Sequence, residues 1–118
     1  MNDIWMSKHH KRQFEQLIRA DGTADWDIER RSMFYIISGN QELFMHADDI
    51  YNFSGRHLRS RYMKKLAFLC SSSLCLLRLS VNLYNGTGRY GTDPHCIFST
   101  LDRRNRTLAV NAISMRYF

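Results

Sequence analysis

The segment of residues 25–40, DWDIERRSMFYIISGN, constrains the fold most, because Met33 to Ile37 is apolar on almost every side. A helix that is apolar all round must be buried by neighbours on all sides. A short buried strand has the same pattern, but the length of the segment favours a helix. Asp25 or Asp27 is suited to start it, and Gly39-Asn40 to end it. We therefore predict a central, buried helix here.

Other helices are expected where capping residues precede apolar positions at helical spacing. Ser7 starts one that ends at Asp21-Gly22, Asn40 starts a short one, and one of Ser71 to Ser73 caps a leucine-rich helix. The expected helices span 7–20, 25–39, 41–46 and 71–85, with a short one from Asp93-Pro94 and a last one from Asp102.

The remaining segments are expected to lack regular structure. We expect a turn or loop at residues 48–52 and an exposed loop or frayed helix at residues 54–65. We expect a mobile glycine-rich loop at residues 86–93. No strand pair with a convincing hairpin turn is expected. The chain has 118 residues, of which 44% are hydrophobic, and proline occurs once. We therefore predict that residues 1–118 form one mainly α domain, a compact bundle of five or six helices.

Charge is distributed unevenly along the chain. Residues 1–53 carry six basic and nine acidic side chains, a net of −3, whereas residues 54–118 carry eleven basic and two acidic ones, a net of +9. Such asymmetry indicates an anionic partner, either nucleic acid or an acidic protein, with simple solvation as the alternative.

Two basic clusters are the candidate binding residues, because arginine binds carboxylates and phosphates and tyrosine rings stack on bases. The arginines of the second cluster, within residues 103–106, lie in the first turn of the expected last helix, where the helix dipole disfavours cations. The two clusters are Arg56, Arg59, Arg61, Tyr62, Lys64 and Lys65, and Arg103, Arg104 and Arg106. Tyr62, Tyr90 and Trp5 are candidate anchors.

The three cysteines favour a reduced, cytoplasmic protein, since their number is odd and no secretory leader precedes them. Zinc binding through Cys70, Cys75, His95 and Cys96, with His9 or His10, is the weaker interpretation because no C-x-x-C pair exists. The preferred interpretation is that the cysteines are buried, unreactive thiols, so no metal or other cofactor is expected. Ser71 to Ser73 and Arg78 interrupt the longest apolar stretch, so no membrane span is expected.

Catalytic motifs are absent from the sequence. GTGRYG at 86–91 lacks the lysine of a phosphate-binding loop, and the serine run lacks the G-x-S-x-G elbow. His95 beside Cys96 has no evident orienting carboxylate. The prediction is a protein that is not an enzyme.

Five blocks of the chain carry a resemblance to a known family: HHKRQFEQLIRADGT, ERRSMFYIISGNQELF, IYNF, FLCSSSLCLLRLSVNLYNG and LDRRNRTLAVNAISMRYF. They resemble a family of small bacterial and prophage-borne proteins classed as a domain of unknown function. The resemblance implies a small, mainly helical intracellular protein. By analogy it also implies a modulator of host machinery, such as an inhibitor of a CRISPR-type nuclease.

The leading hypothesis is a non-enzymatic protein that docks through a basic face on a protein or nucleoprotein partner with an acidic surface. The first alternative is direct nucleic-acid binding, and the second is a small zinc-binding protein or enzyme that uses the Cys and His residues. A homodimer is a further expectation, in which Trp5, Phe44 and Tyr117-Phe118 form an apolar patch that the second copy covers.

Overall fold

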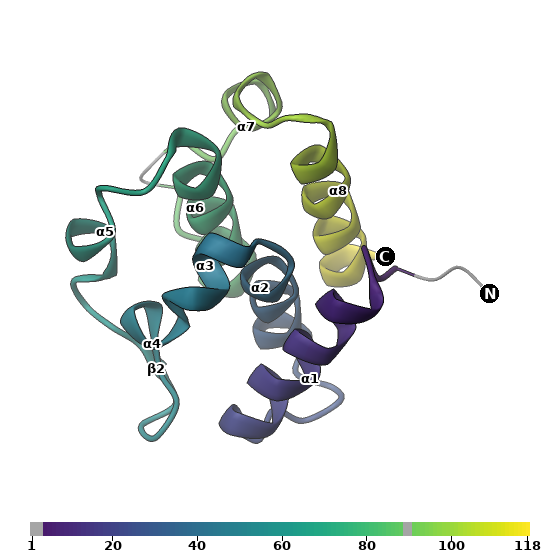
Figure 1. Cartoon of the computed structure of the whole chain (residues 1–118), viewed down its shortest axis with the longest axis vertical. Coiled ribbons are helices and arrows are strands. Elements are labelled where there is room, and N and C mark those ends of the chain that lie inside the picture. The colour runs from purple at the N-terminus through teal and green to yellow at the C-terminus, as the bar shows by residue number, and fades with distance from the viewer. Residues whose placement is uncertain (1–3, 89–90) are drawn as a thin grey trace.

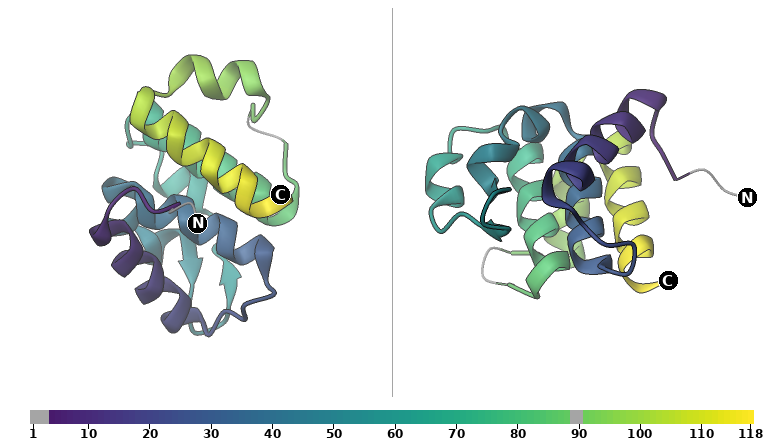
Figure 2. Two further views of the ribbon diagram at one scale, coloured as in Figure 1. Left: turned by 90° about the vertical axis from the view of Figure 1, so that its right-hand side faces the viewer. Right: turned by 90° about the horizontal axis from the view of Figure 1, so that it is seen from below.

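The computed structural model describes residues 4–88 and 91–118, and a single helix forms its centre. Helix α2 (Ile28–Gly39) lies among α1 (Lys8–Asp21), α6 (Ser71–Asn85) and α8 (Arg103–Tyr117), which pack on it from different sides (Figure 1; Figure 2). Every residue of α2 from Ser32 to Gly39 is buried. The prediction of a central, buried helix is confirmed, and the chain is a compact, mainly α domain.

Capping side chains set the starts of five helices as the sequence predicts. Ser7 accepts from the amide of His10, Asp27 from that of Arg30, and Asn40 from that of Leu43 at the start of α3 (Gln41–Met45). Asp93 caps α7 (Pro94–Thr100) and Asp102 caps α8. Gly22 and Gly86 end α1 and α6 in the left-handed conformation, with φ of 71° and 80°.

Close approach of three helices explains the glycine at the end of α2. A Cβ on Gly39 would lie 2.3 Å from Cδ1 of Leu108 on α8 and 3.0 Å from Nε2 of His10 on α1. His10 is itself buried and bonds through Nε2 to the carbonyl of Tyr35 at 2.9 Å. Only glycine leaves room for this contact.

The segment between α3 and α6 is more ordered than the sequence predicts. Residues 47–50 form α4 (Ala47–Ile50), and β1 (Tyr51–Asn52) pairs antiparallel with β2 (His57–Leu58), followed by α5 (Tyr62–Lys65). The expectation of no strand pair is therefore wrong. The sequence pattern does not predict this hairpin because each strand has only two residues. A contact with Asp21, which is distant in sequence, holds its turn. The described residues form eight helices, of which the five with seven or more residues were expected.

The serine run does not cap α6. Cys70 is the N-cap residue and makes no side-chain cap bond, so all three serines lie inside the first turn. Ser73 is buried, and its hydroxyl donates to Oδ1 of Asn40 at 3.4 Å, while the thiol of Cys70 donates to Glu42 at 3.4 Å. Tertiary contacts therefore hold the N-terminal turn of α6 against α3.

The residues proposed as an apolar patch do not all lie exposed. Trp5 packs partly buried against Phe14, with ring centroids 4.9 Å apart, and Phe44 is also partly buried. Tyr117 and Phe118 are exposed. Tyr90 lies outside the described residues, as does part of the expected loop at 86–93. Across the described ranges, no helix has the length and apolar character needed to cross a membrane.

Candidate functional site

The first predicted basic residue, Arg56, is held by the chain's own buried carboxylate. Its Nε and Nη2 donate to the two oxygens of Asp21 at 3.1 and 3.3 Å. The Asp21 side chain is 0% exposed and lies at the end of α1. Arg56 has a φ of 58°, in the left-handed region that residues other than glycine rarely adopt. The contact joins the hairpin turn to the end of α1.

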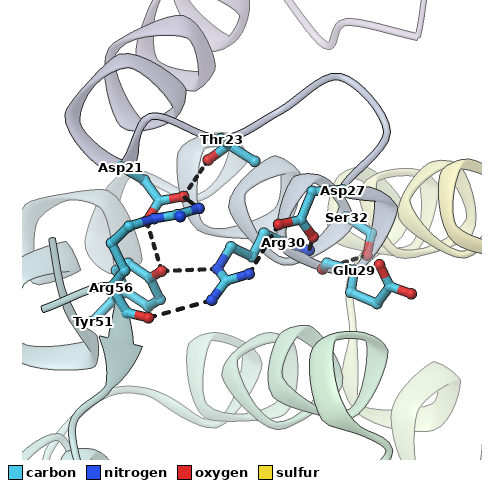
Figure 3. Close-up of polar contacts among 8 residues, drawn as sticks. All are labelled: Asp21, Thr23, Asp27, Glu29, Arg30, Ser32, Tyr51 and Arg56. Carbon is cyan, nitrogen blue, oxygen red and sulfur yellow. Dashed lines mark hydrogen bonds and ion pairs between the residues drawn. The ribbon is translucent and has the colours of Figure 1, made fainter.

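Tyr51 and Arg30 extend this contact into a network (Figure 3). The Tyr51 hydroxyl donates to Oδ1 of Asp21 at 2.6 Å and accepts from Nε of Arg30 at 3.0 Å. Arg30 also donates to Oδ2 of Asp27 at 2.9 Å and to the carbonyl of Arg56 at 3.3 Å. The network joins α1, α2 and the hairpin, which are distant in sequence.

The environment shifts the pKa values of the network residues. Burial by itself raises the pKa of Asp21, but the hydrogen bonds from Arg56, Thr23 and Tyr51 outweigh it and hold that pKa below its ordinary value. Burial, and then the bond to Asp21, raises the pKa of Tyr51 to about 12. At neutral pH the carboxylate is therefore ionised and the phenol is protonated, which is the pairing that their hydrogen bond needs.

Two further residues of the first basic cluster also contact this chain. Arg59 donates through Nε to the carbonyl of Asp48, and Nζ of Lys65 lies 2.7 Å from Oδ1 of Asp49. Arg61 and Lys64 are exposed and make no side-chain hydrogen bond or ion pair with any described residue. Tyr62 is half-buried against the core.

The second basic cluster is divided in the same way. Arg104 donates through Nη1 to the carbonyl of Gly39 at 2.9 Å, so its charge lies at the negative C-terminal end of α2. This contact offsets the unfavourable position of Arg104 in the first turn of α8. Arg103 and Arg106 are exposed, and their side chains bond to nothing in the described ranges. Figure 1 shows the hairpin and α5 on the opposite side of the molecule from the start of α8, so the two clusters form no continuous patch.

These contacts account for part of the charge asymmetry between the two halves of the chain. Three cations of the C-terminal half pair with carboxylates of the N-terminal half: Arg56 with Asp21, Lys65 with Asp49, and Arg116 with Glu29. The folded chain thus neutralises within itself some of the charge from which the sequence indicated an external partner. Binding by the predicted residues stays a prediction.

Helix α1 carries the largest set of cations without partners among the described elements. Four exposed side chains make no hydrogen bond or ion pair with a described residue: Lys8, Lys11, Arg12 and Arg19. Most described carboxylates, by contrast, pair with cations or cap helices, whereas Glu15 and Asp48 are exposed without such a role. The composition of residues 8–12 could have indicated this face.

A groove borders this basic face. One hollow of about 470 Å³ lies between α1 and α3 and has a mixed apolar and polar lining. The lining residues are Gln16, Leu17, Ala20, Gln41, Phe44, Met45, Ala47, Asp48 and Phe53. An adjoining hollow of about 450 Å³ shares Gln16 and Phe44, and the rest of its lining is His9, Arg12, Gln13, Glu15 and Arg19. We call the two together the α1 groove. One end carries Phe44, Met45 and Phe53 beside the carboxylate of Asp48, and the other carries Arg12 and Arg19 beside Glu15. Met45 on the rim is 72% exposed.

The metal candidates do not converge. Cys75 is buried, whereas Cys70 and Cys96 are exposed. In the part of the chain that the structure describes, no group of three His, Cys, Asp or Glu side chains could hold a metal ion. Both nitrogens of His10 are engaged by backbone groups, since Nδ1 accepts from the amide of Met6 at 3.2 Å.

Comparison with known proteins gives one match. A family of unknown function, DUF6075, matches residues 1–118. No curated protein matches the chain. No solved structure matches it either. Since the family match spans the whole sequence, the chain belongs to the DUF6075 family.

Proposed function

We propose that this protein is a non-enzymatic binding protein that docks on an acidic segment of a partner protein and modulates that partner by occlusion. The observation that carries the proposal is the α1 groove, where cations without partners in the described structure lie next to exposed apolar side chains such as Met45. Arginines at such a site give two-pronged contacts to carboxylates, and exposed apolar side chains contact aromatic or aliphatic anchors.

The shape and charge of the groove favour one kind of partner segment. From His9 to Ala20 the groove follows about 16 Å of helix, at about 1.5 Å per residue. Arg12 and Arg19 flank one end, with Glu15 between them, and Phe44 and Met45 border the other. The complementary segment carries carboxylates at one end and large apolar side chains at the other.

Affinity capture tests this proposal. The tagged full chain is incubated with bacterial lysate, with and without nuclease, and the captured material is identified by mass spectrometry. We expect one stoichiometric protein that survives nuclease, and whose purified form binds the purified chain directly in calorimetry. Material that disappears with nuclease would instead establish nucleic acid as the partner and overturn the proposal. The expected CRISPR-type nuclease target is the finer proposal, and the identity of the captured protein tests it.

Matched charge reversals test the location. Arg12→Glu with Arg19→Glu is expected to weaken binding at least tenfold, since each reversal replaces attraction by repulsion. Ala20→Trp, which fills the other end of the groove, is expected to weaken it similarly. The control is Arg61→Glu with Lys64→Glu, an equal charge change on exposed residues of the first basic cluster. Binding that is lost in the control but kept in the groove variants would contradict the groove.

A further inference from the structure

A second hollow, of about 310 Å³, lies between α6 and α7 and plays no part in the proposed function. It is lined on α6 by Ser71, Leu74, Cys75 and Arg78, and on α7 by Cys96 and Thr100. Residues 71, 74, 75 and 78 recur at helical spacing and therefore share one face of α6. We call this hollow the α6–α7 cleft.

Arg78 provides the chemical evidence. Its Nε is buried and has no hydrogen-bond partner, while the residue as a whole is half-buried, and its side chain makes no hydrogen bond or ion pair with a described residue. Leaving a buried donor unpaired costs about 1–3 kcal/mol, and more for a charged group, so native proteins usually pair such a donor with a protein group, an ordered water, an ion or a ligand. A guanidinium only donates, so a ligand that pairs with Arg78 has to supply acceptor atoms.

Ser71 supplies a second donor on the same face. Helical side chains tilt toward the N-terminus of their helix, so Arg78 leans over the turn of Leu74 and Cys75, and Ser71 lies one turn further along the same cleft. The Ser71 hydroxyl makes no hydrogen bond with a described residue, whereas that of Thr100 already donates to the carbonyl of Cys96 at 2.8 Å. A guanidinium fork and a hydroxyl together offer donors to more than two oxygen atoms.

The charges around the cleft favour an anion. No carboxylate lines it, and Glu42 lies toward Cys70 and α3. Ser73, which bonds to Asn40 of the α3 cap, is about 200° around α6 from Ser71, so α3 covers a different face from the cleft. Asp93 is the carboxylate that borders the cleft: it caps α7 by accepting from the amide of Cys96 and lies beside the thiol of Cys96, and it makes no ion pair with Arg78.

We infer that the α6–α7 cleft binds a small tetrahedral oxyanion of the phosphate type through Arg78 and Ser71. Phosphate is preferred to a simple carboxylate because its additional oxygens can accept from Ser71 while the guanidinium holds two others. The inference is independent of the α1 groove and of any protein partner.

Titration of the full-length, isotope-labelled protein with inorganic phosphate tests this inference by amide chemical shifts. We expect saturable shifts at residues 71–78 and 96–100 that sodium chloride of equal ionic strength does not produce. Arg78→Met is expected to reduce the apparent phosphate affinity at least tenfold, and Ser71→Ala to reduce it less. The control Arg106→Met removes an exposed arginine without partners in the described structure and should leave the affinity unchanged.

Stability in the absence of phosphate separates a binding role for Arg78 from a structural one. Arg78→Met keeps most of the apolar stem and removes an unpaired donor, so the melting temperature without phosphate is expected to stay the same or rise. Absence of phosphate-specific shifts, shifts located elsewhere, or equal affinity in Arg78→Met would each overturn the inference. So would a large fall in the melting temperature of Arg78→Met without phosphate, which would assign Arg78 to the fold.

Discussion

Tyr51→Phe is the sharpest test of the network that holds the hairpin to the helices. Tyr51 is 0% exposed, and its ring packs against Phe34 and Phe53 with centroids 5.1 and 5.0 Å away. The substitution keeps these ring contacts. It removes the hydroxyl that donates to Asp21 and accepts from Arg30.

The expected magnitude comes from these two hydrogen bonds. A hydrogen bond to a charged group contributes about 1.5–3 kcal/mol to stability. Asp21 keeps its bonds from Thr23 and Arg56 in the variant, so the lower end of this range applies to each bond. We therefore expect Tyr51→Phe to lower the free energy of unfolding by about 3 kcal/mol, or the melting temperature by about 12 °C.

Urea unfolding followed by circular dichroism at pH 7 measures this loss. Tyr117→Phe is the matched control, because Tyr117 is 60% exposed and the same atom is removed there. The control is expected to change stability by less than about 0.5 kcal/mol. A loss below about 1 kcal/mol for Tyr51→Phe would refute the reasoning, since the hydroxyl would then add little to the network.

Acid should diminish the difference between wild type and variant. The pKa of Asp21 is lowered in the folded state, so its ionised form stabilises the fold above the unfolded value of 3.8. This stabilisation is lost as the pH falls through the folded pKa. In Tyr51→Phe the folded pKa is expected to rise toward 3.8, so below about pH 4 the difference between the two unfolding free energies should shrink to the part that the Arg30 bond contributes.

Three further predictions follow from buried positions. Gly39→Ala is expected to destabilise the protein by about 1–3 kcal/mol, because its Cβ would lie 2.3 Å from a leucine methyl group on α8; a gain in unfolding free energy would contradict this close contact. Burial shields Cys75 and raises its pKa, and the hydrogen bond with Asp93 raises the pKa of exposed Cys96, so a thiol reagent should modify Cys70 first, Cys96 more slowly, and Cys75 only on unfolding. Peptide mass mapping would show this order, and rapid modification of Cys75 in the native state would oppose its buried placement. Burial, with Arg104 nearby, lowers the pKa of His10 below 6.5 despite its bond to a backbone carbonyl, so stability should decline as the pH falls from 6.5. His10→Gln should reduce this pH dependence of the unfolding free energy, measured in urea titrations between about pH 5 and 8. An unchanged pH dependence would show that other groups cause it.

Local signals made much of the helical structure predictable. Ser7, Asp27, Asn40, Asp93 and Asp102 each lie directly before a helix and accept from amides in its first turn. Such capping involves residues two or three positions apart, so the sequence displays it directly. The uniformly apolar run of α2 likewise predicted a helix buried on all sides.

The roles of the basic residues were less predictable because their partners lie far away in the sequence. Arg56 looks like a solvated cation in the sequence, yet its carboxylate partner lies 35 residues earlier. Arg104 looks misplaced at a helix start until α8 packs across the end of α2. For the same reason, the α1 groove escaped a reading of the sequence, since its lining comes from α1, α3, α4 and the hairpin.

The sequence by itself determined where the main helices begin and end and which of them is central, because caps, stops and apolar periodicity act within a few residues. Tertiary structure alone decided which cations are neutralised, how Tyr51 and Asp21 hold a two-residue hairpin, and which surfaces are hollow. Those properties depend on contacts between segments far apart in the chain. Such contacts exist only after the helices have packed around α2.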